Sequence, residues 1–343
     1  MRKRIFSILQ YLVFLGGGLF LVWWQLKSMT EAEQAEFKDA FEHANYWLVI
    51  PVVIMILLSH LSRAMRWKLL MEPLGYQPKL KNVFAVTMVG YLANSAVPRL
   101  GEVLKCTFLS RYEKLKVDKL VGTILVERTF DLLCYLVFIG ITVLIQIDMV
   151  GAFVKKELLE ITKSEGMPLW AKAAIAVLII AGIIYLLRFL RKKYPENSII
   201  VKTNNFLRGL GAGFTAIRTL KHRKQFVGHT LFIWTLYLLQ IYIGFSAMDG
   251  TSHLSIKAAC SVLSLATLAM IATPGGIGSF PLFVGQTLAL YAIHPSMGTA
   301  FGWLIWGVNT GLIIVAGLIA LLLLPYLNKQ QHEINPGDTV ENI

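Results

Sequence analysis

Residues 82–110 read NVFAVTMVGYLANSAVPRLGEVLKCTFLS, an apolar stretch that Pro98 and Gly101 interrupt. A helix needs about 20 residues to cross the hydrocarbon core of a bilayer, so these 29 residues are too few for two crossings. Proline lacks a backbone donor and clashes with the preceding turn, which ends the first helix near Pro98. The stretch therefore predicts a broken, re-entrant helical hairpin that enters the membrane and leaves it on the same side.

Longer apolar blocks lie on both sides of this hairpin, each near or above the length of a membrane span. We predict six spans, at residues 5–26, 46–66, 121–146, 170–190, 226–248 and 299–326. A second apolar region at 255–293 is also broken, and here a re-entrant hairpin and a tight pair of full spans both stay open. The block 5–26 exceeds the apolar core of a signal peptide and precedes no small-x-small site, so we interpret it as an uncleaved span.

The composition agrees with a membrane protein. Hydrophobic residues make up 56% of the 343 residues and charged residues only 15%, against about 25% charged residues in soluble domains. The predicted fold class is an all-α integral membrane protein with about six transmembrane helices and two broken re-entrant helical hairpins. Residues 1–327 form the polytopic membrane domain and residues 328–343 a short cytoplasmic tail. Two amphipathic stretches accompany the spans, an acidic one at 31–44 and a basic one at 198–221.

The basic residues predict the orientation, because cytoplasmic loops are enriched in Lys and Arg. With both termini in the cytoplasm, 25 of the 33 Lys and Arg residues lie inside, 7 lie outside and Arg128 lies within a span. The hairpin at 82–110 then enters from the cytoplasm and the region 255–293 enters from outside, so the two halves are related as an inverted repeat. Inverted repeats with broken helices near the midplane are typical of transporters.

The charge and the motifs argue against several function classes. The net charge of +13 points to anionic lipid headgroups rather than to nucleic acid, because the basic residues cluster at the ends of apolar blocks. The three cysteines and seven histidines are dispersed, without the spacing of a metal site or a disulfide framework. No G-x-x-x-x-G-K-[ST] motif of an ATPase occurs. We therefore expect no cofactor, no metal, no nucleic-acid partner and no enzymatic activity.

The first candidate site is the polar tip of the hairpin at 82–110. Polar groups inside an apolar region are costly and usually line a cavity or a site. A half-helix that starts near Gly101 would direct free N–H groups and its positive dipole end inward beside Arg99, which suits a phosphate. In the alternative interpretation, Arg99 pairs with Glu102 and only holds the hairpin together. The candidate residues are Asn94, Pro98, Arg99, Gly101, Glu102 and Lys105.

The second candidate lies in the third predicted span. Glu127 and Asp131 are four residues apart and share a helix face, and Arg128 follows Glu127 directly. Glu102, Glu127 or Asp131 could couple transport to protons if burial raises the pKa of that acid. In the alternative interpretation, Glu127 and Asp131 form structural ion pairs with Arg99, Lys105 or Arg128.

The third candidate is the segment 273–281, which reads TPGGIGSFP. Its glycines permit a tight break and close backbone approach. Ser279 could cap the following half-helix, and Pro281 suits its first turn. The candidate site residues are Pro274, Gly275, Gly276 and Gly278, with a glycine hinge or packing corner as the alternative.

A basic and aromatic group ends the second predicted span. It consists of Arg63, Arg66, Trp67 and Lys68. Such residues are common anchors at the membrane interface, and we interpret them in this way. Selection of a lipid headgroup by Arg66 and Trp67 is the alternative.

The order of these motifs resembles the transmembrane region of lysylphosphatidylglycerol synthase, a group of flippase-like membrane proteins. The pattern R-x-x-R-W, N-x-x-x-P-x-R-x-G-E-x-x-K, E-R-x-x-D and P-G-G-x-G extends over nearly the whole chain. The matching residues are Arg63, Arg66, Trp67, Asn94, Pro98, Arg99, Gly101, Glu102, Lys105, Glu127, Arg128, Asp131, Pro274, Gly275, Gly276 and Gly278. The resemblance implies a translocase in the cytoplasmic (inner) membrane for a charged or aminoacylated phospholipid or a polyprenyl-phosphate lipid, and it is compatible with a homodimer.

Two departures limit what this resemblance implies. Bifunctional family members add a synthetase domain, which we do not expect here, so lipid synthesis is not implied. Many relatives place a glutamate shortly after P-G-G-x-G, whereas this chain reads Ser279-Phe280-Pro281. A mechanism that needs this acid is therefore not implied either.

The leading functional hypothesis is a flippase or scramblase that holds an anionic phospholipid headgroup near Arg99 while the acyl chains stay in the bilayer. Rocking of the two repeats would expose the site to each leaflet in turn. The alternative is a membrane glycosyl- or phosphotransferase with a lipid-linked donor, which needs an acidic pair at a membrane surface. The segment 31–42 offers acids, but their spacing is that of a solvated helix face. A purely non-catalytic membrane partner does not explain the buried charges.

Overall fold

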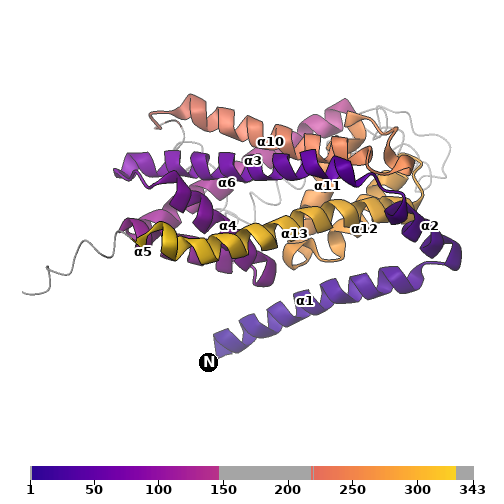
Figure 1. Ribbon diagram of the computed structural model, residues 1–343, viewed down its shortest axis with the longest axis horizontal. Coiled ribbons are helices and arrows are strands. Elements are labelled where there is room, and N and C mark those ends of the chain that lie inside the picture. The colour runs from indigo at the N-terminus through magenta and orange to yellow at the C-terminus, as the bar shows by residue number, and fades with distance from the viewer. Residues whose placement is uncertain (1, 147–217, 219, 330–343) are drawn as a thin grey trace, which may run out of the picture. The chain divides into compact units, whose positions relative to one another are not determined.

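The computed structural model describes residues 2–146, 218 and 220–329, and within them it contains helices and turns without a strand (Figure 1). The chain divides into two compact units, Met1–Glu127 with Thr219–Ile343, and Arg128–Arg218. The predicted span 170–190 lies outside the described residues, as do most of the basic stretch 198–221 and most of the tail.

Ten α-helices make up the described part of the chain. Their bounds are α1 Arg2–Ser28, α2 Glu31–Glu42, α3 Val49–Met71, α4 Leu80–Ala96, α5 Leu100–Glu113, α6 Val117–Ile145, α10 Arg223–Phe245, α11 Ile256–Ala272, α12 Ser279–Ala289 and α13 Pro295–Leu327. Short 3-10 turns at Tyr46–Leu48 and Glu72–Leu74 extend α3 at both ends.

Four of these helical segments are long and apolar enough to cross a membrane. They are Tyr46–Leu74, Val117–Ile145, Arg223–Phe245 and Pro295–Leu327, and they coincide with the predicted spans at 46–66, 121–146, 226–248 and 299–326. The other described prediction, 5–26, lies within α1. Large apolar side chains are exposed along these helices, for example Leu125 at 64% and Leu322 at 68%. Such surfaces suit hydrocarbon rather than water, and the all-α membrane fold class is confirmed.

The first broken region is a hairpin of two short helices. α4 ends at Ala96 and α5 begins at Leu100, so Pro98 lies in the turn, where it was predicted. The helices approach so closely that a Cβ atom on Gly101 would lie 1.9 Å from the carbonyl oxygen of Gly90. Two glycines facing each other are therefore what allows α4 and α5 to pack as a pair.

The second broken region, 255–293, has the same organisation. α11 has 17 residues and α12 has 11, and both are shorter than the about 20 residues of a full span. Between them, Gly275, Gly276 and Gly278 adopt φ angles of 62°, 74° and 70°. This left-handed region is readily accessible only to glycine, which explains the glycines of the motif. Of the two interpretations left open, the structure has the helical hairpin and not a pair of full-length helices.

The two hairpins enter the bundle from opposite ends of α13 (Figure 1). Beside the base of the first hairpin, Lys81 Nζ donates to the carbonyl oxygen of Leu327 at 3.1 Å, at the carboxyl end of α13. α12 instead leads directly into the amino end of α13. The tips meet, since a Cβ atom on Gly275 would lie 3.8 Å from Ser95 Cα. Opposed entry is the arrangement that an inverted repeat requires, while the repeat itself stays a prediction.

The predicted acidic stretch at 31–44 forms α2. Thr30 caps this helix: its hydroxyl accepts the Glu33 N–H at 3.3 Å, and its own N–H donates to the Glu33 carboxylate at 2.8 Å. The Thr30 N–H and the Thr30 hydroxyl, which donates to the same carboxylate at 2.9 Å, together hold the pKa of Glu33 below its usual value. Glu36 joins α2 to the start of α13, because its carboxylate lies 2.8 Å from His294 Nδ1.

Candidate functional site

A buried carboxylate, Glu127 on α6, is surrounded by three cations. Arg66 Nη2 donates to Glu127 Oε1 at 3.4 Å, and Lys105 Nζ donates to Oε2 at 3.3 Å. Arg63 Nη1 lies 3.8 Å from Oε1. These four side chains, which we call the Glu127 cluster, come from α3, α5 and α6. The structure thus joins residues up to 64 positions apart in the sequence.

Burial of this cluster corrects one interpretation. Arg66 and Trp67 are both 0% exposed, so neither is an interface anchor. The Lys105 ammonium lies 3.9 Å from the centre of the Trp67 ring, in a cation–π contact. The Trp67 indole donates to the Thr123 hydroxyl at 2.9 Å, which fixes the ring under the ammonium. The alternative interpretation, in which Arg66 and Trp67 select a lipid headgroup, stays a prediction.

α10 contributes residues to this environment that the sequence did not single out. Arg66 Nη1 donates to the Thr230 hydroxyl at 3.1 Å, and its guanidinium lies 5.5 Å from the Phe226 ring centre. Arg63 Nη2 donates to the Tyr237 hydroxyl at 3.0 Å. A fork of planar N–H donors held by several partners is the geometry that recognises carboxylates and phosphates. The one sequence feature that could have indicated this contact is Thr230, a polar residue inside the apolar block 226–248.

The first hairpin tip is built differently from the prediction. The Asn94 side-chain oxygen accepts the Gly101 N–H at 2.7 Å, so α4 caps the first turn of α5. The predicted set of free N–H groups at this helix start is therefore partly occupied. Asn94, Pro98, Arg99 and Gly101 do lie together here, as predicted.

Arg99 occupies the turn itself, in a strained backbone conformation. Its φ angle is 68°, in the left-handed region that costs a non-glycine residue about 1–2 kcal/mol. The side chain is exposed and makes no ion pair with any described residue, so the alternative Arg99–Glu102 pair is not formed. Lys105, six residues further along α5, lies about 9 Å away at the helical rise of 1.5 Å per residue. α5 thus connects the tip directly to the Glu127 cluster.

The second hairpin tip forms a hydrogen-bonded turn. The Thr273 hydroxyl lies 2.7 Å from the Ser279 hydroxyl, and Ser279 donates to the carbonyl of Ala269 at 2.8 Å. Ser279 therefore holds α11 and α12 together and does not cap α12, which corrects the prediction. The carbonyl oxygen of Gly275 accepts a hydrogen bond from Trp306 Nε1 at 2.8 Å. The P-G-G-x-G segment is a packed corner that touches the first tip, and its role in binding stays a prediction.

The remaining candidates are Arg128, Asp131 and Glu102. Arg128 and Asp131 belong to the second compact unit, Arg128–Arg218, and their part in the site stays a prediction. Glu102 follows Gly101 in the first turn of α5 and is half-buried. Among the described residues no group of three or more His, Cys, Asp or Glu side chains could hold a metal ion.

Comparison with known proteins assigns the family. Residues 7–317 match the lysylphosphatidylglycerol synthase transmembrane region. The chain belongs to this family. The Glu127 cluster therefore belongs to a member of the lysylphosphatidylglycerol synthase transmembrane family. The protein is a multi-pass membrane protein.

A curated relative matches over most of both chains. A UPF0104 membrane protein of Methanocaldococcus jannaschii is 22% identical over 299 residues, which cover 81% of this chain and 84% of the relative. No solved structure matches. The resemblance stated from the motifs is thus confirmed at the level of the lysylphosphatidylglycerol synthase transmembrane family.

Replacing Arg99 by glycine is expected to raise stability by about 1 kcal/mol, because glycine adopts the positive φ without strain. Arg99 makes no ion pair with a described residue, so the change strands no charged partner there. If Arg99 contacts lipid phosphate, Arg99→Gly and Arg99→Lys should both slow lipid exchange, since lysine lacks the bidentate fork. Thermal unfolding and leaflet exchange of the purified variants measure the two effects.

Lys114 provides the matched control for Arg99. It is also exposed and has a φ angle of 54° at the other end of α5. Lys114→Gly should bring a similar gain in stability with unchanged transport. Wild-type transport by both Arg99 variants would show that the guanidinium is not a ligand.

Proposed function

We propose that this protein is a flippase or scramblase that moves an anionic or otherwise charged phospholipid, or a polyprenyl-phosphate lipid, between leaflets. The observation that carries the proposal is the Glu127 cluster. Ionisable residues inside membrane helices are costly and mark substrate and ion pathways in transporters. Two arginines and a lysine around one carboxylate are more cations than one structural ion pair needs.

The cluster has the chemistry of an anion-binding site in which the Glu127 carboxylate takes the place of the bound anion. Arg63, Arg66 and Lys105 converge within 4 Å of the two Glu127 oxygens. A lipid phosphate offers the same kind of oxygen acceptors and can compete with Glu127 for these donors. The carboxylate then balances the cations when no lipid is bound, and it is displaced when the headgroup enters.

The hairpins supply the moving parts. Broken helices whose tips meet near the midplane are used by transporters to open a site alternately to each side. Here the tips touch at Ser95 and Gly275, and α5 carries Lys105 from the first tip to the cluster. Movement of this hairpin would shift Lys105 relative to Glu127. The polar headgroup would then cross beside the cluster while the acyl chains stay in the bilayer.

Leaflet exchange by the purified protein in vesicles tests the proposal. Vesicles should contain one headgroup-labelled lipid each: phosphatidylglycerol, its lysyl ester, a polyprenyl phosphate or phosphatidylcholine. We expect at least one charged lipid to exchange about tenfold faster than in protein-free vesicles, a change equivalent to about 1.4 kcal/mol in the barrier. Lys105→Met should lose this gain, whereas Lys119→Met, an exposed lysine on α6, should keep it. Exchange at the protein-free rate for every charged lipid would contradict the proposal.

A further inference from the structure

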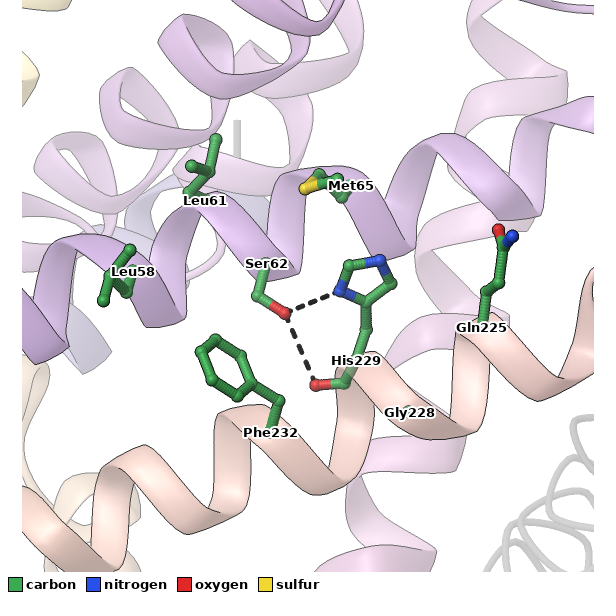
Figure 2. Close-up of a pocket in the computed structure, with 8 residues that line it drawn as sticks. All are labelled: Leu58, Leu61, Ser62, Met65, Gln225, Gly228, His229 and Phe232. Carbon is green, nitrogen blue, oxygen red and sulfur yellow. Dashed lines mark hydrogen bonds between the residues drawn. The ribbon is translucent and has the colours of Figure 1, made fainter.

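An open groove lies between α3 and α10, on another face of α3 from the Glu127 cluster (Figure 2). Its volume is about 450 Å³, within the range of about 300–1,000 Å³ for small-molecule sites. Leu58, Leu61 and Phe232 line one end, and Gln225 lies at the other. Leu58 and Phe232 are 41% and 45% exposed. The groove therefore opens on the outer side of two helices that are long and apolar enough to span the membrane.

The absence of a side chain keeps this groove open. Gly228 lines it, and a Cβ atom there would meet no other atom within 4 Å. The helix does not need glycine at this position, because Gly228 lies inside a regular helix, where glycine costs about 1 kcal/mol relative to alanine. Space, rather than backbone geometry, is what this glycine provides.

A polar pair lies in the middle of the apolar lining. The Ser62 hydroxyl lies 2.9 Å from His229 Nδ1, and Figure 2 shows the two side chains facing each other. His229 Nε2 makes no hydrogen bond with any described residue. When the Ser62 hydroxyl donates to Nδ1, the ring proton resides on Nε2, which is then a free donor. Gln225, one helical turn away, adds an exposed amide.

The polar end of the groove approaches a basic helix end. α10 begins at Arg223, about 9 Å from His229 along the helix, and the next residue is the exposed Lys224. Lys68 lies one turn beyond the groove residue Met65 on α3. None of these three cations forms an ion pair with a described residue. The acid at this end, Glu72, faces His222 at 3.9 Å.

We propose that this groove binds one anionic phospholipid from the leaflet in which α10 begins. An acyl chain lies along Leu58, Leu61 and Phe232, and the ester oxygens accept from His229 and Gln225. The phosphate lies near the basic helix ends, where each cation contributes to attracting anionic headgroups. The order of apolar, hydrogen-bonding and basic groups along the groove is the order of parts in a phospholipid. This inference concerns binding alone and does not depend on transport.

Photolabelling of the full-length protein in vesicles tests this site. The probes are phosphatidylglycerol and phosphatidylcholine that carry the same diazirine-bearing acyl chain. Residues 318–323 of α13 provide the reference surface, because they too expose large apolar side chains. With phosphatidylglycerol, labelling of 58–65 and 225–232 should exceed labelling of 318–323 by about tenfold, equivalent to 1.4 kcal/mol of binding free energy. With phosphatidylcholine this excess should fall.

Two glycine variants make the test specific. Gly228→Leu places a side chain in the groove, and Gly311→Leu places the same side chain on α13, where a Cβ atom also meets nothing within 4 Å. Both should fold, which thermal unfolding checks. Gly228→Leu should remove the excess labelling, and Gly311→Leu should leave it unchanged. Equal labelling of groove and reference surface, equal labelling by both lipids, or labelling that persists in Gly228→Leu would each overturn the proposal.

Discussion

Replacing Glu127 by glutamine is expected to destabilise the protein by about 3–5 kcal/mol, the range found when one partner of a buried ion pair is removed. Glutamine has nearly the same shape, so the loss reports charge rather than packing. Arg66 is 0% exposed, and its guanidinium would face a neutral amide at the position of the carboxylate oxygen that it now contacts at 3.4 Å. Urea-induced unfolding in detergent micelles measures this loss.

An acid on the same helix provides the control for Glu127. Asp118 lies in the first turn of α6 and is exposed. Asp118→Asn should cost no more than about 1 kcal/mol, the size of a helix-dipole interaction. Equal stability of Glu127→Gln and wild type would show that the cations do not depend on this carboxylate.

Replacing Gly101 by alanine is expected to cost about 3 kcal/mol or more and to open the first hairpin. The new Cβ atom would lie 1.9 Å from the Gly90 carbonyl oxygen and 2.6 Å from Asn94 Cγ. The first of these is a backbone atom that cannot rotate away, so α4 and α5 must separate. Overpacking of this kind typically costs about 1–3 kcal/mol where side chains can yield, and more where they cannot. The same separation would move Lys105 and remove transport.

Gly122 distinguishes this clash from a general effect of adding a methyl group to a membrane helix. A Cβ atom on Gly122 of α6 meets nothing within 4 Å. Gly122→Ala should therefore be neutral or stabilise by up to about 1 kcal/mol through helix propensity. If Gly101→Ala unfolds at the same temperature as Gly122→Ala, then the close packing of α4 on α5 is wrong.

The helical breaks could be predicted from the sequence because they depend on local chemistry. Pro98 cannot continue a helix, and the glycines of the P-G-G-x-G segment are needed wherever φ is positive. The number of residues in the first broken region is also too small for two full spans, since about 20 residues are needed per crossing. These constraints act within a few residues, which is why the positions of both turns agree with the structure.

The partners of Glu127 could not be chosen from the sequence in the same way. Several cations were near enough to Glu127 in the predicted topology. The alternative pair with Lys105 is formed, while Arg99 makes no ion pair with a described residue. Which cation reaches the carboxylate depends on helix rotation, because about 100° separates successive residues. The same uncertainty made Arg66 and Trp67 look like interface anchors, since their span ends near a charged segment. The contact of Thr230 with Arg66 and the groove at Ser62 and His229 form only when α10 packs on α3, so the sequence alone could not predict them.

The most direct test of the Glu127 cluster as a lipid site is the exchange rate of a charged lipid by the quadruple variant Arg63→Met/Arg66→Met/Lys105→Met/Glu127→Leu. Replacing all members of a buried ionic group by apolar residues is often neutral or stabilising, so this variant should remain folded, whereas Glu127→Gln leaves three buried cations without their carboxylate. If the cluster holds the lipid phosphate, the folded quadruple variant should exchange charged lipid at the rate of protein-free vesicles. Exchange at the wild-type rate by this folded variant would contradict the claim that the Glu127 cluster binds the transported headgroup.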